Sequence, residues 1–312
     1  MLTLGWSDGN TFIPLAFSQL SSEKESNRLC GVNGSIDKRT NGYQRRKEAV
    51  RKSTEVLLEL LGQAKSYMVP ASYILFDSWF AFPKLIRKAW DLYQLHTVCM
   101  LKAMPKVYYE YQGQRLNLNQ LYAAVKKRRD RAKILSSIVV GIGQLENGEQ
   151  LAARIVFVRD RRQRRKWLAL LTTDTELPDD EVVRIYGKRW NIEVFFKMSK
   201  SYLRLAKEFQ TRSYDSMVAH TTIVFIRYTI LALESRSGQD PRTIGNLFYE
   251  CCDEVRDISL TEALQMILSL LERFLEDHVR LAEAEIRKLI DYLISGLPSF
   301  FKDRLAVCYC ES

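Results

Sequence analysis

Residues 185–200, IYGKRWNIEVFFKMSK, place four polar side chains with possible chemistry among large apolar ones: Tyr186, Arg189, Glu193 and Lys200. At about 100° per residue, positions i, i+3, i+7 and i+14 fall within roughly 60° of one another around a helix. The spacing therefore predicts one polar stripe that combines an acid with three groups able to bind a phosphate. The alternative is a core helix with an Arg–Glu pair at its solvent edge.

The start of this helix is marked by Pro178 and by the acids Asp179, Asp180 and Glu181. Proline suits a first helical turn, and acids complement the positive end of the helix dipole. We expect a helix from 179 to about 207. Since it is apolar on most sides, it should be buried, and a buried carboxylate needs a partner or a metal.

A second acid, Asp77, follows the short apolar run YILF. The carboxyl end of a strand is where α/β folds place active-site groups, although Asp77 could instead cap the following helix. Asp77 and Glu193 together could hold Mg²⁺, which takes oxygen ligands. Two such ions (Mn²⁺ could replace Mg²⁺) would activate the attacking oxygen and stabilise the leaving oxygen at phosphorus.

A basic run, RDRRQRRK, spans residues 159–166 and ends beside Trp167. Cations beside an exposed aromatic can hold a nucleic-acid backbone and stack an unpaired base. The candidate DNA contacts in the run are Arg161, Arg162, Arg164 and Arg165. A solvated charged face and ordinary strand packing of Trp167 remain the alternatives. A second basic run at 126–133 could be only a solvated turn.

The chain of 312 residues carries a net charge of +10 and 46% hydrophobic residues. Length and composition predict a globular protein of one or two domains, and the charge favours nucleic acid as partner over a membrane. Residues 221–235 are apolar but short for a span and contain Arg227, so we expect a buried helix. Without CxxC pairs, the cysteines indicate reduced thiols in a cytoplasmic protein; they are Cys30, Cys99, Cys251, Cys252, Cys308 and Cys310.

Periodicity predicts a hairpin within 2–20 that turns at SDGN, and a loop over 22–44. A helix (45–66), a strand ending at Asp77, a helix (81–93) and a strand (96–103) follow in the order of an α/β fold. Residues 104–172 are β-rich. Helices are expected at 179–207, 213–235, 242–256, 260–276 and 281–295.

The pattern Tyr-x2-Arg-x3-Glu-x6-Lys at 186–200 resembles the signature of a group of bacterial insertion-sequence transposases with a DDE, ribonuclease H-like catalytic domain. YILFDSWF resembles that group's second acidic motif, which implies that Asp77 and Glu193 are catalytic metal ligands. The KWL strand is also similar, and this implies that Trp167 stacks on a flipped base. Arg189, Lys200 and Tyr186 would contact DNA phosphates.

The resemblance implies an α/β fold with a ribonuclease H-like mixed sheet, a β-rich insertion and a helical C-terminal region. The expected domains are a first core part (1–103), the insertion (104–172), a core part with the Glu-bearing helix (173–212) and the C-terminal region (213–312). The implied reaction is metal-dependent endonuclease cleavage and strand transfer in DNA transposition. The implied partners are transposon-end and target DNA, bound by a homodimer on paired ends.

In one feature the chain departs from this group, whose first catalytic Asp lies on a strand ahead of the hairpin. The chain begins at the hairpin, so we interpret it as N-terminally truncated and expect little strand cleavage. Asp8, which could replace that acid, fits a turn residue better. The alternatives are a non-catalytic DNA-binding remnant and a hydrolase of another substrate that uses Asp77 and Glu193 as an acid/base pair.

Overall fold

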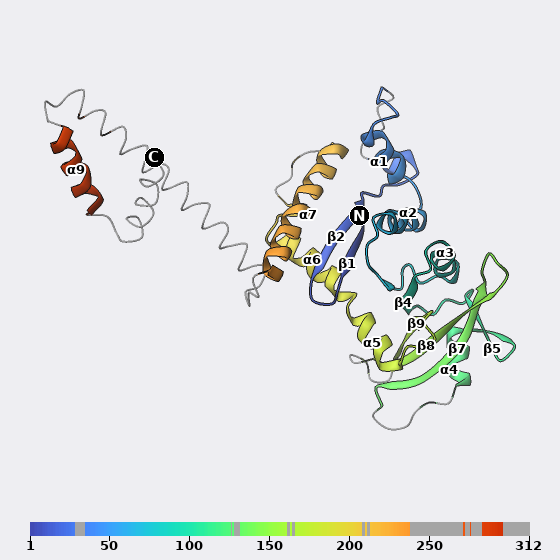
Figure 1. Ribbon diagram of the computed structural model, residues 1–312. Coiled ribbons are helices and arrows are strands. Elements are labelled where there is room, and N and C mark those ends of the chain that lie inside the picture. The colour runs from blue at the N-terminus through green and yellow to red at the C-terminus, as the bar shows by residue number, and fades with distance from the viewer. Residues whose placement is uncertain are drawn as a thin grey trace. The chain divides into compact units, whose positions relative to one another are not determined.

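The computed structural model describes residues 1–28, 35–125, 127, 132–160, 163, 166–207, 210, 213–237, 271, 275 and 283–295. The chain divides into two compact units, Met1–Arg236 and Ser237–Ser312, and each is described by itself. Figure 1 shows the first unit as strands and helices together. The predicted helices at 242–256 and 260–276 lie outside the described residues, apart from single positions.

The predicted hairpin is confirmed as β1 (Leu2–Ser7) and β2 (Phe12–Ser18), which pair antiparallel. Its turn contains Gly9 at φ 104°, a backbone angle that glycine adopts at little cost. The hairpin forms a two-stranded sheet of its own, next to α6 in Figure 1.

The other described strands form a seven-stranded sheet in the order β3-β4-β9-β8-β7-β5-β6. Their bounds are β3 Tyr73–Phe76, β4 His96–Leu101, β5 Tyr108–Tyr111, β6 Gln114–Asn117, β7 Ile134–Gln144, β8 Gln150–Arg159 and β9 Trp167–Thr172. Among the pairs formed by these described strands, only β3–β4 is parallel. The α/β class is thus confirmed, and the strands of the β-rich segment continue the sheet that contains β3 and β4.

The helices before the β-rich segment differ from the prediction in one place. The expected helix at 45–66 is two helices, α1 (Asn41–Ala49) and α2 (Ser53–Ser66), because the backbone is extended at Lys52. The predicted helix at 81–93 is confirmed as α3 (Pro83–Tyr93).

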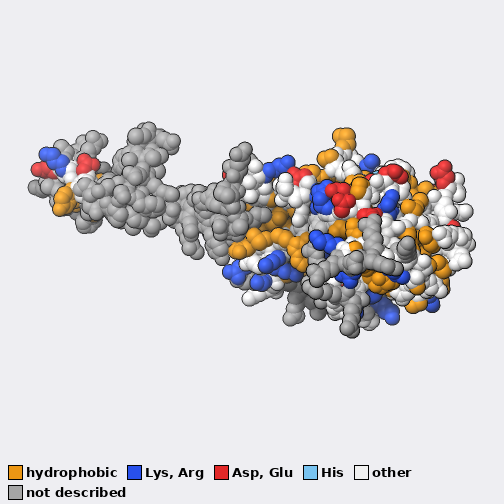
Figure 2. All heavy atoms as spheres, turned by 90° about the horizontal axis from the view of Figure 1, so that it is seen from below, with side chains coloured by type: hydrophobic (Ala, Val, Ile, Leu, Met, Phe, Trp, Pro, Cys, Tyr) orange, Lys and Arg blue, Asp and Glu red, His pale blue; other side chains and the backbone are white. Residues whose placement is uncertain are grey.

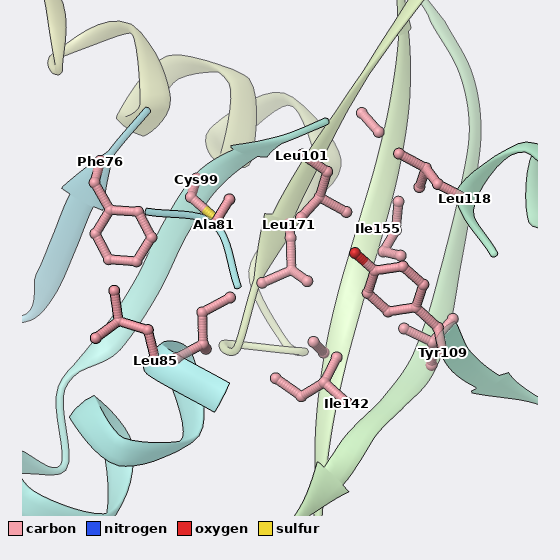
Figure 3. Close-up of a cluster of buried hydrophobic side chains, with 14 of the residues drawn as sticks. Phe76, Ala81, Leu85, Cys99, Leu101, Tyr109, Leu118, Ile142, Ile155 and Leu171 are labelled. Atoms are coloured by element: carbon pink, nitrogen blue, oxygen red, sulfur yellow. The ribbon is translucent and has the colours of Figure 1, made fainter. Parts of the chain in front are cut away.

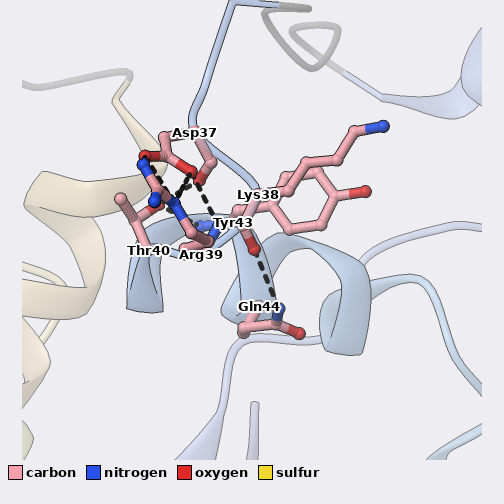
Figure 4. Close-up of polar contacts among 6 residues, drawn as sticks. All are labelled: Asp37, Lys38, Arg39, Thr40, Tyr43 and Gln44. Atoms are coloured by element: carbon pink, nitrogen blue, oxygen red, sulfur yellow. Dashed lines mark hydrogen bonds and ion pairs between the residues drawn. The ribbon is translucent and has the colours of Figure 1, made fainter.

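Helix α1 begins with local polar contacts. The Thr40 hydroxyl accepts from the Tyr43 amide, and the Gln44 side chain donates to the Lys38 carbonyl (Figure 4). Such side-chain bonds satisfy amides and carbonyls that would otherwise lack partners at a helix start. Two short elements went unpredicted, the 3-10 turn η1 (Glu25–Asn27) and α4 (Leu118–Ala124).

Apolar side chains from the large sheet and from α2, α3 and α4 form one buried cluster (Figure 3). Phe76 contributes from β3, Cys99 from β4, Leu171 from β9 and Ile155 from β8. Burial raises the pKa of the Cys99 thiol, as expected for a reduced, unreactive core cysteine. The other five cysteines lie outside the described residues.

The segment with the polar stripe is two helices rather than one, α5 (Asp179–Gly187) and α6 (Trp190–Ser201). Between them the amides of Lys188 and Arg189 donate to carbonyls three residues back, at 3.0 and 3.1 Å, in place of the usual four. Gly187 lies at this junction, where a residue without Cβ weakens an α-helix. The second helix ends at Ser201, not near 207.

Helix α7 (Tyr214–Ser237) packs one face against the hairpin and α6, with the Phe225 ring 5.0 Å from those of Phe17 and Phe195. Residues Tyr214–Arg236 are long and apolar enough to cross a membrane by length and composition, and 33% of their most apolar window is buried. One such helix is weak evidence for a membrane span. In the second unit, α9 (Glu283–Ser295) falls within the helix expected at 281–295.

Candidate active site

Asp77 lies directly after β3, as predicted, and its side chain is exposed. One carboxylate oxygen accepts a hydrogen bond of 2.9 Å from the backbone amide of Trp79. This contact holds the carboxylate at the turn between β3 and α3, where the helix itself begins only at Pro83. Asp77 is therefore not the N-cap of α3, and its second oxygen is available to a ligand.

Arg189 and Glu193 form the centre of the predicted stripe. Arg189 Nη2 lies 2.6 Å from Glu193 Oε1, and the side chains are 20% and 41% exposed, respectively. The guanidinium also lies 5.6 Å from the centre of the Tyr186 ring. The junction between α5 and α6 keeps Arg189 about one turn from Tyr186 on one side and from Glu193 on the other, so the predicted cluster is present despite the break.

Burial raises the pKa of the Tyr186 hydroxyl; the Arg189 guanidinium opposes this, and the charge of Asp77 adds to it. Burial alone would lower the pKa of Arg189, but the hydrogen bond to Glu193 and the contact with Tyr186 outweigh it, so this pKa is raised. Arg189 therefore stays a cation, as a phosphate contact requires. Its Nε is buried without a hydrogen-bond partner.

The strand acid and the helix cluster border the same hollow. Asp77 and Arg189 line one cavity together with Ile192. Because Arg189 holds Glu193, the structure brings Asp77, Tyr186, Arg189 and Glu193 to one region. Lys200 is apart from this cluster; it is exposed near the end of α6, with its ammonium 6.0 Å from the Phe196 ring centre.

Trp167 begins β9 at the same end of the sheet as Asp77. Phe76 pairs with Cys99, and Cys99 pairs with Leu171, so Trp167 extends beyond the level of Asp77 on a strand two positions away. Its ring stacks on Tyr122, with centroids 4.5 Å apart. One ring face is therefore in contact with the protein's own core in this structure.

The basic run before β9 leads to this same end of the sheet. The predicted DNA contacts Arg161, Arg162, Arg164 and Arg165 lie outside the described residues, as does most of the run at 126–133. On the face drawn in Figure 2, Lys and Arg side chains lie among hydrophobic ones.

Asp8 is a turn residue, as its position in SDGN indicates. One carboxylate oxygen accepts from the amides of Asn10 (2.9 Å) and Thr11 (2.8 Å), and the other lies 2.6 Å from Arg236. These contacts, the Thr11 and Asn10 amides foremost, lower the pKa of Asp8 to about 2.

We expect Asp8→Asn to lower the melting temperature in a pH-dependent way. The depressed pKa means that ionised Asp8 stabilises the fold above the unfolded pKa near 4, and that this contribution is lost as pH falls through about 2. Asparagine keeps the oxygen acceptor but loses the charge facing Arg236. Thermal unfolding of both proteins between pH 2 and 7 should show curves that converge at the acid end. A constant difference at every pH would contradict the assignment.

The described residues supply at most a partial set of metal ligands. Asp77 and Glu193 are oxygen donors of the kind that Mg²⁺ prefers. No group of three His, Cys, Asp or Glu side chains able to hold a metal occurs in the described part of the chain. One Glu193 oxygen is engaged by Arg189. The donor type fits a divalent ion, whereas the number of donors is low for a protein-bound site.

Two exposed tryptophans border this region and were not singled out from the sequence. Trp79, two residues after Asp77, is 72% exposed, and Trp190, next to Arg189, is 56% exposed. The only sequence signal was their adjacency to candidate residues, since exposure of one tryptophan cannot be read from periodicity.

An acid after a strand, together with an Arg–Glu–Tyr cluster on paired helices of an α/β fold, is the kind of site that acts on phosphate groups. A family model described as transposase DDE domain matches residues 42–230. The match covers more than half of the chain and contains all the candidate residues, so the protein belongs to the transposase DDE domain family. The mixed α/β fold is consistent with a ribonuclease H-like domain. A search of curated proteins found no match.

Proposed function

We propose that this protein acts in DNA strand cleavage and strand transfer during transposition of an insertion sequence. Its family is that of transposases, which implies DNA as partner and the general use of divalent metal ions. The observation that carries the proposal is that Asp77, directly after β3, and Arg189, from the α5–α6 segment, line one cavity, and that Arg189 is paired with Glu193.

Each residue of the cluster has a proposed role. Asp77 and Glu193 would hold divalent metal ions, which supply charge stabilisation to phosphoryl transfer. Arg189 would donate to phosphate oxygens through its guanidinium. The Tyr186 ring, which contacts this guanidinium, would position it. Lys200, exposed further along α6, would contact the DNA backbone.

Further roles follow from the resemblance and, for the basic run, from its charge. Trp167 would stack on a flipped base, and because Tyr122 already stacks on one face of its ring, at most the opposite face could do so. Arg161, Arg162, Arg164 and Arg165 would contact the DNA backbone. Residues 104–172 would act as an insertion domain, and residues 213–312 as a helical region for homodimer contacts on paired ends. We propose that the protein acts in the cytoplasm.

Nicking of supercoiled plasmid DNA with Mg²⁺ or Mn²⁺ tests the catalytic proposal. We expect little strand cleavage by residues 1–312 alone, because the described residues provide only two candidate carboxylates. Robust metal-dependent nicking that Glu193→Ala abolishes would show that the two acids suffice. Failure to bind DNA even at low salt would instead count against the transposase role.

A second candidate is a non-catalytic DNA-binding form that competes with an active transposase for element ends. The Arg189–Glu193 ion pair favours it, since an arginine and an acid that neutralise each other leave fewer free ligands for a metal. Under this proposal the chain binds element-end DNA and inhibits cleavage by an active transposase in the same reaction, while its own nicking stays at background with either metal.

We expect Lys200→Ala to weaken DNA binding uniformly across sequences. Each phosphate contact contributes about 0.9 to the slope of log affinity against log salt, so the variant should lower this slope by about one unit. Fluorescence anisotropy between 50 and 200 mM salt would measure it. Lys65→Ala, an exposed lysine on α2, is the control. Equal slopes for Lys200→Ala and wild type would remove Lys200 from the interface.

A further inference from the structure

An exposed aromatic side chain lies beside the strand acid of the candidate site. The Trp79 indole is 72% exposed, although Trp79 follows Asp77 by only two residues. In the described part of the chain, no other ring, cation or hydrogen-bond acceptor engages this indole. Tryptophan is highly buried on average in folded proteins, so an indole left in solvent next to a candidate metal ligand indicates that its ring is available to a ligand.

The backbone on both sides of Trp79 is held in place. The Trp79 amide donates to a carboxylate oxygen of Asp77 at 2.9 Å, and the Phe80 amide donates to the Asp77 carbonyl at 3.3 Å. The Phe80 ring packs against the buried ring of Phe76, with centroids 6.4 Å apart. The turn is therefore anchored to the core while the indole stays in solvent. Such pre-organisation lowers the entropy cost of binding.

The surface that follows this turn adds a second aromatic ring and two cations. Phe82, three residues after Trp79, is 39% exposed and directly precedes α3. Lys84 and Lys88 are exposed on α3, and residues four apart share one face of a helix. Aromatic rings beside cations are the combination that binds single-stranded DNA, since the rings stack on bases and the cations follow the backbone.

The separation of Trp79 from Asp77 limits which bases the indole can reach. Two residues of backbone span at most about 7 Å. Successive phosphates of one DNA strand are about 3.4 Å apart along the helix axis. A phosphate held at Asp77 therefore lies within about two nucleotides of Trp79.

We propose that Trp79 stacks on an unpaired base of the DNA strand whose phosphate is held at Asp77. This inference rests on the proposed function for the presence of that strand, and it adds a binding site for an unpaired base beside the cavity. The site is separate from Trp167, which lies on a strand two positions away in the sheet. Every base has a π-face, so the stack selects unpaired over paired DNA and does not select a sequence.

A comparison of two proteins on two DNA molecules tests the stack. One DNA is a labelled duplex with a short thymidine tail, and the other has abasic sites throughout the same tail; tails of both polarities are measured. Fluorescence anisotropy in Mg²⁺ gives the affinity of the full chain and of Trp79→Ala for each. We expect loss of the bases to weaken wild-type binding at least about fivefold in one polarity, the lower end for one base–aromatic stack. Trp79→Ala should bind both tails as wild type binds the abasic one, because a shared contact is lost only once.

Three controls separate stacking from folding and from a general loss of aromatic surface. Trp79→Phe keeps a ring and should retain most of the preference for the thymidine tail. Tyr67→Ala removes another exposed aromatic side chain, 81% exposed and ahead of β3, and should leave the preference unchanged. The melting temperature of Trp79→Ala should match that of wild type, because little of the indole is buried.

Binding to the blunt duplex distinguishes failure of this inference from failure of the proposed function. If wild type binds the blunt duplex but does not distinguish thymidine from abasic tails, Trp79 does not stack on a base. Equal weakening of blunt and tailed duplex by Trp79→Ala, or losses from the variant and the abasic tail that multiply, would overturn the inference in the same way and leave DNA binding intact. If wild type binds no DNA even at low salt, the proposed function fails and the inference fails with it.

Discussion

Phe195→Ala is expected to lower the free energy of unfolding by about 3–5 kcal/mol, the range for removing a buried phenylalanine. The Phe195 ring is fully buried and lies 5.2 Å from that of Phe12, 5.0 Å from Phe225 and 4.7 Å from Tyr228. It thus joins the helix that carries Glu193 to the hairpin and to α7. Its loss leaves a cavity where three elements meet.

Val194→Ala is the matched control, because Val194 is the preceding residue on α6 and is 41% exposed. We expect it to change stability by less than about 0.5 kcal/mol. Urea unfolding followed by circular dichroism measures both variants. Similar losses for the two, or a loss below about 1 kcal/mol for Phe195→Ala, would contradict the packing of α6 described above.

Glu193→Gln is expected to tighten DNA binding about tenfold without divalent metal and to lose that advantage with Mg²⁺. The substitution removes a negative charge and releases Arg189 from its 2.6 Å ion pair. A unit charge about 10 Å from a phosphate is worth roughly 1.7 kcal/mol at an effective dielectric of 20, before salt screening. With Mg²⁺, wild type regains affinity because Glu193 can share the ion with the phosphate.

Paired titrations of a short duplex in EDTA and in Mg²⁺ measure this reversal. Glu146→Gln, which removes an exposed acid from the loop between β7 and β8, is the control for net charge alone. If both variants tighten binding equally, the effect is not local to the site. If the advantage of Glu193→Gln persists in Mg²⁺, Glu193 is not a metal ligand.

The expectations met by the structure depend on short-range chemistry. The Asp-Gly turn predicts the hairpin, and a four-residue apolar run followed by Asp77 predicts β3 and its end. The spacing of Tyr186, Arg189 and Glu193 predicts their cluster, because each neighbouring pair is about one helical turn apart, and these contacts survive the break between α5 and α6. Lys200 lies fourteen residues after Tyr186, so its predicted place in the polar stripe required one continuous helix. The break between α5 and α6 removes that continuity.

Other features depended on tertiary contacts. The single helix expected at 45–66 divides at Lys52. Just before this break, the carbonyl of Ala49 accepts a hydrogen bond from the amide of Ser21, which comes from a distant part of the chain. The packing of Trp167 on Tyr122 likewise joins residues far apart in sequence. No local pattern could indicate it, because an indole at the start of a strand can pack against the protein or remain exposed.

The sequence by itself determined the acids, their spacing and the family to which they point, since these follow from residue type and local periodicity. Only the tertiary structure decided that Arg189, whose pair with Glu193 is a local i,i+4 contact, lines a cavity with Asp77. It alone decided that β1 and β3 line the same two cavities. Both depend on which strand edges and helix faces meet, and that is governed by the packing of side chains from distant segments.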